Sequence, residues 1–442
     1  MPFSSLILLS LKNAISTSII RYPYVATEII CSDIPFINDY LLGSENDEME
    51  KIKSCLKAES DEDIKVEDFN DSNTEKNKME IELKNNAEIS TVDTQIQEKP
   101  IQRLFKIFEE PNVNAVNAGY FSKILIHLLT KNTNEVNDFI FNSPELWGAL
   151  IECCDSSSID DVLTKLLNVE PMNGEIDDPY LSHKMQTVRM LINKMDPIFS
   201  EEANIGACKV LMEHLQNKIV SDVLIESESL LKFKTQTLNG TNSSFRCALR
   251  LLISYIDLEK RKYIHNDESI KKIETLVLEL ISPLCEKLKE CCQHKYYWNN
   301  QQNIKCTALG MANQRIIEFI DSIIRLNKIS ILTLLNKCGA FTILINFIGI
   351  FYSNTNAHIL IFAIFKYCAQ DAHLCKDIII QNDIAGLMYG LHSDRTGVFQ
   401  SGRTFIKPYH THLMSLAQLI EKKRNTMPYL DEYLQSKLLI RN

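Results

Sequence analysis

Two groups of cysteine and histidine residues are the first places to look for chemistry in this sequence of 442 residues. Each group places thiols and an imidazole in one short stretch: Cys285, Cys291, Cys292 and His294, then Cys368, His373 and Cys375. A zinc site uses such ligands, most often as a Cys-x-x-Cys pair with a matching second pair. Neither group has that spacing, so we expect buried thiols and a surface histidine, with no metal and no other cofactor.

Catalytic motifs are missing from the sequence. Nucleophilic catalysis needs a nucleophile beside a base that a third group orients. The chain contains no Gly-x-Ser-x-Gly elbow, no phosphate-binding glycine-rich loop and no His-Glu-x-x-His pair. The carboxylates of Glu28, Asp33 and Asp39 fit helix caps and surface positions better than a catalytic cluster. We therefore expect no enzyme activity. An all-α enzyme that uses the cysteine and histidine groups is the alternative, and stoichiometric zinc would support it.

Two polar segments that contain aromatic residues are the better candidates for binding a partner. The first, within His294–Asn303, presents Tyr296, Tyr297 and Trp298. The second, Arg395–Lys407, presents Arg395, Phe399, Arg403 and Lys407. Tyrosine and tryptophan are frequent anchors of protein interfaces, and the cations suit an acidic partner surface. We expect both segments to be loops. The alternatives are that the rings of the first pack back on the helices and that the second is merely solvated.

Amphipathic helices must position these segments, and the stretch Ala118–Val169 shows them most clearly. Apolar residues recur there at the i, i+3, i+4, i+7, i+8 spacing of one helical face: Phe121, Ile124, Leu125, Leu128 and Leu129, then Ile159, Val162, Leu163, Leu166 and Leu167. Leu146, Leu150 and Ile151 begin another face after Pro144. We predict three short helices here, the last one capped near Ser158. None can bury its apolar face alone, so neighbouring helices must stack on it.

The same pattern continues along the chain, and no strand-like alternation extends beyond a few residues. We predict an all-α fold, an armadillo- or HEAT-like α-solenoid of degenerate paired helices with a unit of about 40 residues. Loops are expected at Pro171–Pro179, Lys234–Ser244, His294–Asn303 and Thr396–Pro408. The apolar runs Ala340–Tyr352 and Ala357–Ala369 are too short to span about 30 Å of hydrocarbon. They are expected to be buried central helices, so no membrane association is predicted.

Charge divides the chain into three parts. Residues 44–99 contain 17 Asp and Glu against 8 Lys, a net charge of −9 out of −10 for the whole chain. This segment has one aromatic residue, Phe69, and cannot bury enough apolar surface to offset chain entropy. We predict N-terminal helices of the solenoid at 1–43, a disordered acidic insertion at 44–100 and the main solenoid at 101–442. The near-neutral remainder excludes the basic surface that nucleic-acid binding needs.

The cysteines and the first residues bear on location. Thirteen cysteines in no regular framework, with vicinal pairs at Cys153–Cys154 and Cys291–Cys292, indicate reduced thiols in the cytoplasm, and the nucleus fits equally. Met1–Ile20 has a short apolar core that is broken by Ser10, and no Lys or Arg precedes it. We therefore do not expect a secretory signal peptide.

Three stretches carry longer motifs in a fixed order along the chain. The first is RYPYVATEIICSDIPFINDYL, Arg21–Leu41; the second joins IQRLFKIFEE (101–110) to AGYFSKILIHLLTKN (118–132) and SSIDDVLTKLLNVEP (157–171). The third is RIIEFIDSIIRLNKISILTLLNKCGAFTILINFI (315–348), followed by Asn356–His358, Gly402-Arg403 and His412-Leu413. In this order they resemble the SAPS family, the phosphatase-associated regulatory subunits of the protein phosphatase 6 type. The resemblance covers most of Arg21–Gln435 and is weak between about Asp178 and Tyr263.

This resemblance implies a function. It implies a non-catalytic regulatory or scaffold subunit that binds a Ser/Thr protein phosphatase catalytic subunit and directs it to substrates. A third subunit of ankyrin type is implied as a further partner. The metal-ligand signatures of the phosphatases themselves, with their Gly-Asp-x-His and Gly-Asn-His groups, do not occur in the chain. The alternative from another class is an α-solenoid transport or vesicle-coat adaptor, unrelated to phosphatases.

The chain departs from the family pattern in two places. Family members have a longer helical segment before the Arg-Tyr-Pro stretch, whereas here only the 20 residues before Arg21 stand in its place, so we expect a truncated or wrongly assigned start. The acidic insertion also separates two stretches that lie close together in the family. Functions that depend on the N-terminal helices are therefore not carried over.

Overall fold

The computed structural model describes residues 23–32, 35–43, 100–109, 113–168, 178–261, 267–293, 296–299, 305–398 and 402–439. Helices dominate this part of the chain, and its strands form two short hairpins. The predicted all-α class is thereby confirmed. The chain divides into two compact units, Met1–Tyr180 and Leu181–Asn442. Residues 1–22 and all of the acidic segment except Pro100 lie outside the described residues.

The first unit is built from short helices around one longer helix. Its elements are α2 (Pro23–Ile30), α3 (Pro35–Leu42), α6 (Pro100–Leu104), the 3-10 helix η3 (Phe105–Glu109), α7 (Ala115–Lys131), α8 (Thr133–Phe141), α9 (Pro144–Glu152) and α10 (Ser157–Leu167). The predicted apolar faces of α7 and α10 are buried, and these two helices pack on each other. Helix α2 packs on α7 and α3 on α6, so helices on both sides of the acidic segment share this unit.

One helix of the first unit was missed. The sequence predicted three helices between Ala118 and Val169, but the structure has four, because α8 separates α7 from α9. Its buried side chains are Val136, Asn137, Ile140 and Phe141, so a polar residue interrupts a short apolar face and weakens the helical period. The start of α10 was also misplaced, since its N-cap is Ser156 and not Ser158.

The second unit contains the remaining elements. They are α11 (Leu181–Lys194), α12 (Glu201–Glu213), α13 (Lys218–Leu224), α14 (Ser227–Asn239), α15 (Asn242–Arg261), α16 (Asp267–Gln293), β1 (Tyr296–Asn299), β2 (Lys305–Ala308), α17 (Met311–Ile324), α18 (Ile329–Lys337), α19 (Ala340–Ile350), α20 (Thr355–Gln370), α21 (Ala372–Leu374), the π-helix η4 (Cys375–Ile380), α22 (Ile384–Ser393), β3 (Thr396–Val398), β4 (Thr404–Ile406), α23 (Tyr409–Arg424) and α24 (Pro428–Leu439).

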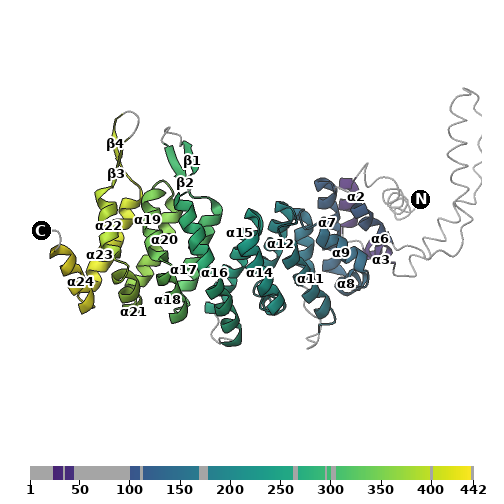
Figure 1. Ribbon diagram of the computed structural model, residues 1–442. Helices are drawn as coiled ribbons and strands as arrows, with labels where there is room; N and C mark the ends of the chain where they lie inside the picture. Colours follow the sequence, from purple (N-terminus) through teal and green to yellow (C-terminus); the bar gives the residue numbers. More distant parts are fainter. Residues whose placement is uncertain are drawn as a thin grey trace, which may run out of the picture. The chain divides into compact units, whose positions relative to one another are not determined.

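Helices of the second unit lie in two rows. Successive contacts link α12, α15, α17, α20 and α23 in one row, and α11, α14, α16, α19 and α22 in the other. Each helix of the second row also contacts the helix of the first row that follows it in this order, from α11 with α12 to α22 with α23. Figure 1 shows these pairs side by side along the unit. Each pair thus covers the apolar face of the next.

The middle of the second unit is its most apolar part. In α19 and α20 the fully buried side chains include Phe341, Phe347, Phe362 and Phe365, so the prediction of buried central helices is confirmed. No single helix of the described residues is long and apolar enough to cross a membrane. Helices α18 and α19 together would reach that length and composition, but they are bent by 57° at their junction.

The prediction of a loop at Lys234–Ser244 is wrong. Helix α14 runs on to Asn239, and only Gly240 and Thr241 separate it from α15. The end of α14 is polar yet buried, because the Gln236 side-chain amide donates to the Ile192 carbonyl (3.0 Å) and the Asp196 carboxylate (2.9 Å). Gln236, one of the polar residues on which the loop prediction was based, thus links α14 to α11 by a hydrogen bond.

Candidate functional site

Three connections between the two helix rows lie at one edge of the second unit. The chain passes from α16 to α17 through the β1–β2 hairpin, from α19 to α20 through residues 351–354, and from α22 to α23 through the β3–β4 hairpin. Figure 1 shows both hairpins rising from the same side of the helices. We call the two hairpins and the connection 351–354 the hairpin edge. The sequence predicted loops at both hairpins, and the structure corrects this.

The β1–β2 hairpin displays aromatic side chains. Strand β1 is exposed at every residue, with Tyr296 77%, Tyr297 53% and Trp298 50% exposed. Strand β2 pairs with β1 in antiparallel register. Its Cys306 is buried, with only 1% of its surface exposed. Cys306 is the cross-strand partner of Trp298, so both side chains lie on one face of the hairpin. The body of the protein therefore supports β2, and β2 holds the aromatic strand β1 outward.

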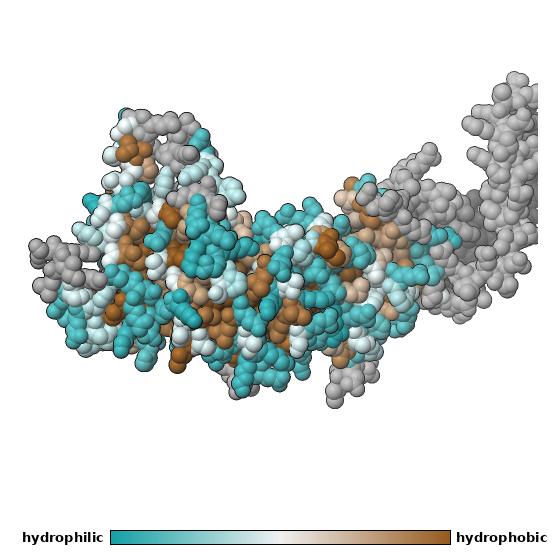
Figure 2. Space-filling view, viewed as in Figure 1, coloured by the Kyte–Doolittle hydropathy of each residue, from teal (hydrophilic) through white to brown (hydrophobic). Residues whose placement is uncertain are grey.

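The β3–β4 hairpin has one covered face and one open face. Gly397 and Phe405 are cross-strand partners, and the Phe405 ring lies over the glycine so closely that a methyl group there would overlap it. On the opposite face Val398 and Ile406 are each 63% exposed. Figure 2 shows apolar surface on this hairpin. The open face therefore presents aliphatic side chains to solvent.

Tyr352, in the middle connection, contacts both hairpins. Its hydroxyl lies 3.9 Å from the Cys306 sulfur of β2. Its ring centroid lies 6.5 Å from that of Phe405 in β4, and the Lys407 ammonium lies 5.6 Å above it. Burial, followed by the hydrogen bond to Cys306, raises the pKa of Tyr352, which is therefore a neutral phenol at pH 7. One side chain thus ties together hairpins that are about a hundred residues apart in sequence.

The cations predicted in the second segment have different roles in the structure. The Lys407 ammonium lies 2.7 Å from the Asp394 carboxylate and is largely buried. The Arg395 guanidinium donates to His392 Nε2 (3.2 Å) and to the His392 carbonyl (3.1 Å). Arg403 is exposed, and among the described residues nothing is paired with it. Lys407 and Arg395 therefore brace the base of the hairpin, whereas Arg403 is displayed near its tip. Phe399 lies outside the described residues.

A tyrosine and a histidine pair hold that base. The Tyr409 hydroxyl donates to the carbonyls of Leu391 (3.1 Å) and Asp394 (3.0 Å), which joins the start of α23 to the end of α22. His392 Nδ1 lies 3.2 Å from His410 Nε2. Partial burial, the Arg395 charge and then His410 lower the pKa of His392. His392 is therefore neutral at pH 7, accepting at Nε2 from Arg395 and donating from Nδ1 to His410.

Of the two cysteine groups, Cys285, Cys368 and Cys375 are buried, as predicted, whereas Cys291 and Cys292 are half-buried. Burial raises the pKa of Cys285 to about 12, and those of Cys291 and Cys375 to about 11. Cys368 is fully buried in α20, and His373 is exposed on α21. Among the described residues, no three His, Cys, Asp or Glu side chains lie close enough together to hold a metal ion. His294 lies outside the described residues.

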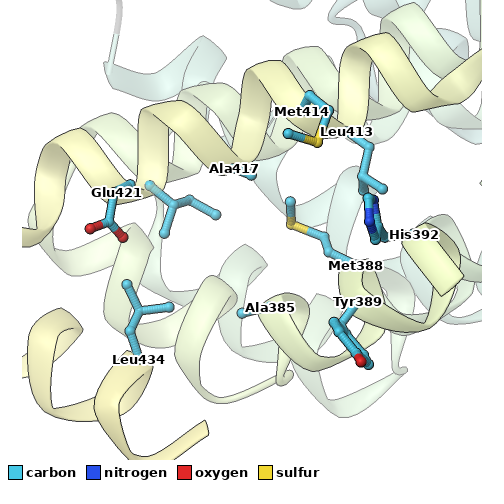
Figure 3. A pocket seen from close by; sticks show the side chains of 10 residues that line it. Ala385, Met388, Tyr389, His392, Leu413, Met414, Ala417, Glu421 and Leu434 are labelled. Atoms are coloured by element: carbon cyan, nitrogen blue, oxygen red, sulfur yellow. The ribbon is translucent and has the colours of Figure 1, made fainter. Parts of the chain in front are cut away.

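An apolar cavity of about 260 Å³ opens between α22, α23 and α24. Figure 3 shows Met388 and Met414 facing each other across it, with Leu434 of α24 at one side. The polar groups at its rim are already engaged, since Glu421 pairs with Arg424 (3.2 Å) and His392 with Arg395. The cavity accepts an apolar group, but it offers no polar group to orient one.

The covered face of the β3–β4 hairpin can be tested at Gly397. In Gly397→Ala the new methyl group must displace the Phe405 ring from its position beside Tyr352. We expect the hairpin to lose about 1–3 kcal/mol of local stability, measured as faster amide exchange at Phe405 and Lys407. Gly390→Ala is the control, because a methyl group in this part of α22 meets nothing within 4 Å. Unchanged exchange in Gly397→Ala would show that the ring does not support the hairpin.

The structure thus unites the two predicted surfaces and adds residues that the sequence did not single out. Tyr352, Val398 and Ile406 belong to the hairpin edge on burial and contact. The signal for Tyr352 was weak, because it ends an apolar run and only the following Ser353 and Asn354 mark a turn. Val398 and Ile406 belong to strands of three residues, which are too short to show alternation.

Comparison with known proteins adds no relative to this description. A scan against protein-family models found none that matches the chain, and a search of curated proteins found none with significant similarity to it.

Proposed function

We propose that this chain is a non-catalytic regulatory or scaffold subunit that binds a Ser/Thr protein phosphatase catalytic subunit and directs it to substrates. The resemblance of Arg21–Gln435 to the SAPS family supplies the identity of the partner. The observation that carries the binding role is the hairpin edge, where two hairpins and Tyr352 gather exposed aromatic and aliphatic side chains on one side of the second unit.

The chemistry of the hairpin edge fits binding. Tyr296, Trp298 and Ile406 are at least half exposed, and large aromatic side chains anchor protein interfaces. The titratable groups around them are already engaged, since Lys407 pairs with Asp394 and Arg395 with His392. A subunit of this kind supplies binding energy and raises the local concentration of substrate, while the metal chemistry stays with the catalytic partner.

The proposed architecture is an armadillo- or HEAT-like α-solenoid of degenerate paired helices. What supports it is the pattern of contacts in the second unit, where each helix pair contacts the pairs before and after it. Such stacks present long, rigid edges and faces, and the connections between their helices vary without disturbing the stack. The two hairpins are insertions of that kind, in connections that run in the same direction between the rows.

Affinity purification of the full chain from cells, followed by mass spectrometry, tests the proposal. We expect a catalytic subunit of the protein phosphatase 6 type among the specific partners, together with an ankyrin-type third subunit. The purified chain alone should not hydrolyse a phosphopeptide. Recovery of vesicle-coat or cargo proteins in place of a phosphatase would favour the adaptor alternative, and turnover by the isolated chain would refute both proposals.

A further inference from the structure

We propose that the open edge of strand β4 binds an extended segment of a partner protein, in which apolar and acidic residues alternate, by adding it as a third strand. This inference rests on the proposed binding role of the hairpin edge and specifies the chemistry of what is bound there. It concerns the outer side of the β3–β4 hairpin, beyond the residues that contact Tyr352.

The register of the hairpin shows which backbone groups point outward. The Lys407 amide donates to the Arg395 carbonyl (2.8 Å), so these two residues form a hydrogen-bonded pair. Hydrogen-bonded pairs alternate along an antiparallel ladder. Gly397 and Phe405 are then the next hydrogen-bonded pair, while Thr404 pairs with Val398, and Ile406 with Thr396, without bonds across the hairpin. The N–H and C=O groups of Thr404 and Ile406 therefore point away from β3.

Nothing in the described part of the chain satisfies these outward groups. No backbone or side-chain hydrogen bond between described residues involves the amide or carbonyl of Thr404 or Ile406. Both residues are exposed. An exposed strand edge with free donors and acceptors is a template for another strand, and proteins usually block such edges with charges, proline or a covering element. Here the strand itself carries Thr-Phe-Ile and leaves its edge open.

The side chains that flank this edge define the partner's chemistry. Ile406 and Thr404 lie on the open face, whereas Phe405 and Lys407 lie on the other face. Arg403, which directly precedes the strand, is exposed. An added strand must match both faces at once. Apolar side chains of the added strand would cover Ile406, which is 63% exposed. Acidic residues between them would meet the exposed guanidinium of Arg403, with which no described residue is paired. A segment that alternates aliphatic and acidic residues has this pattern.

A partner segment fits this edge better than a second copy of the chain. Each strand of the hairpin has only three residues, so pairing β4 with β4 of another copy would bury far less than the roughly 1,200 Å² of a stable interface. An extended peptide segment needs only the edge of one short strand, because strand addition takes its affinity from main-chain hydrogen bonds and from pockets for alternate side chains.

A synthetic peptide tests strand addition directly. The probe is a fluorescein-labelled peptide with the core Thr-Val-Glu-Val-Glu-Val-Thr, and anisotropy measures its binding to the full chain. Two N-methylated versions, one at the valine amides and one at the glutamate amides, remove alternate backbone donors. Strand addition predicts a loss of about tenfold or more in only one version, the valine one for antiparallel pairing. Equal losses in both, or no binding by the parent peptide, would overturn the proposal.

A pair of variants tests the protein side. Thr404→Pro removes the outward N–H of β4 at a position that makes no bond across the hairpin, whereas Thr404→Val keeps that N–H and the side-chain shape. We expect about a tenfold loss of peptide binding in Thr404→Pro and none in Thr404→Val. Amide exchange at Phe405 and Lys407 reports whether the hairpin stays folded. Peptide binding that survives in folded Thr404→Pro would place the peptide elsewhere.

The same preparations keep this inference separate from the proposed function. The affinity purification tests whether the chain binds a phosphatase, and it does not involve the peptide. A phosphatase that is recovered by wild type and Thr404→Pro alike, together with a peptide that fails to bind, would remove strand addition and leave the regulatory role standing.

Discussion

Replacing Tyr296 and Trp298 by alanine is expected to weaken binding of the catalytic subunit by about 30-fold or more, the effect of losing an interface anchor worth ~2 kcal/mol. Both side chains stand on the outer strand β1 and are 77% and 50% exposed in the free chain. Their removal therefore costs little folding free energy, because the buried side of the hairpin, with Cys306 at 1% exposure, stays in place.

The measurement is the dissociation constant for purified catalytic subunit on immobilised wild type and double variant. Leu231→Ala is the matched control, since Leu231 on α14 is 62% exposed but lies away from the hairpin edge. We expect its affinity to match wild type. A double variant with unchanged affinity and unchanged melting temperature would remove β1 from the interface. An equal loss in Leu231→Ala would mean that the contact is spread over the helices.

Helical periodicity predicted the helices well wherever one face is apolar and the other polar. The ten apolar residues assigned to the faces of α7 and α10 are all buried. Helical periodicity gave a wrong prediction where the buried face of a helix is itself polar, as at the end of α14. Gln236 and Thr237 are at most 1% exposed there, and hydrogen bonds of Gln236 to α11 and Asp196 replace apolar contact. A helical face defined by tertiary hydrogen bonds leaves no period in apolar residues.

The hairpin edge was predictable in its residues and not in its geometry. Composition alone pointed to Tyr296–Trp298 and to the Arg395–Lys407 segment, because aromatic and basic side chains in polar surroundings are unusual. Their pairing into hairpins depends on strands of three and four residues, which are too short for alternation to identify. Their proximity depends on the stacking of helix pairs, which brings Cys306, Tyr352 and Phe405 together. The sequence of any one segment does not show which distant segments such stacking brings together.

Acid is expected to destabilise the second unit through His358, by about 2 kcal/mol between pH 7 and pH 5. This side chain is fully buried in α20. Its Nε2 lies 3.1 Å from the Phe351 carbonyl and donates to it. Burial is the main reason that the pKa of His358 is lowered to about 4, and the nearby His412 lowers it further. Backbone hydrogen bonds to Phe351 and Ile348 act in the opposite direction.

The direction follows from the protons that each state binds. In the unfolded chain the histidine has its ordinary pKa of about 6.5, so it takes up a proton as the pH falls below that value. In the folded chain it stays neutral until about pH 4. Between these values the unfolded state binds more protons, and stability therefore falls as the pH falls. Above pH 6.5 the effect vanishes, because His358 is neutral in both states.

His358→Gln tests this, because glutamine keeps an N–H donor for the Phe351 carbonyl and cannot take up a proton. We expect the variant to lose the part of the pH dependence that lies between pH 7 and pH 5. Hydrogen exchange of peptides from α20 measures the stability of this unit separately from the other. His373→Gln, at an exposed position on α21, should keep the full wild-type slope. If wild type and His358→Gln have the same slope, His358 must be protonated inside the fold.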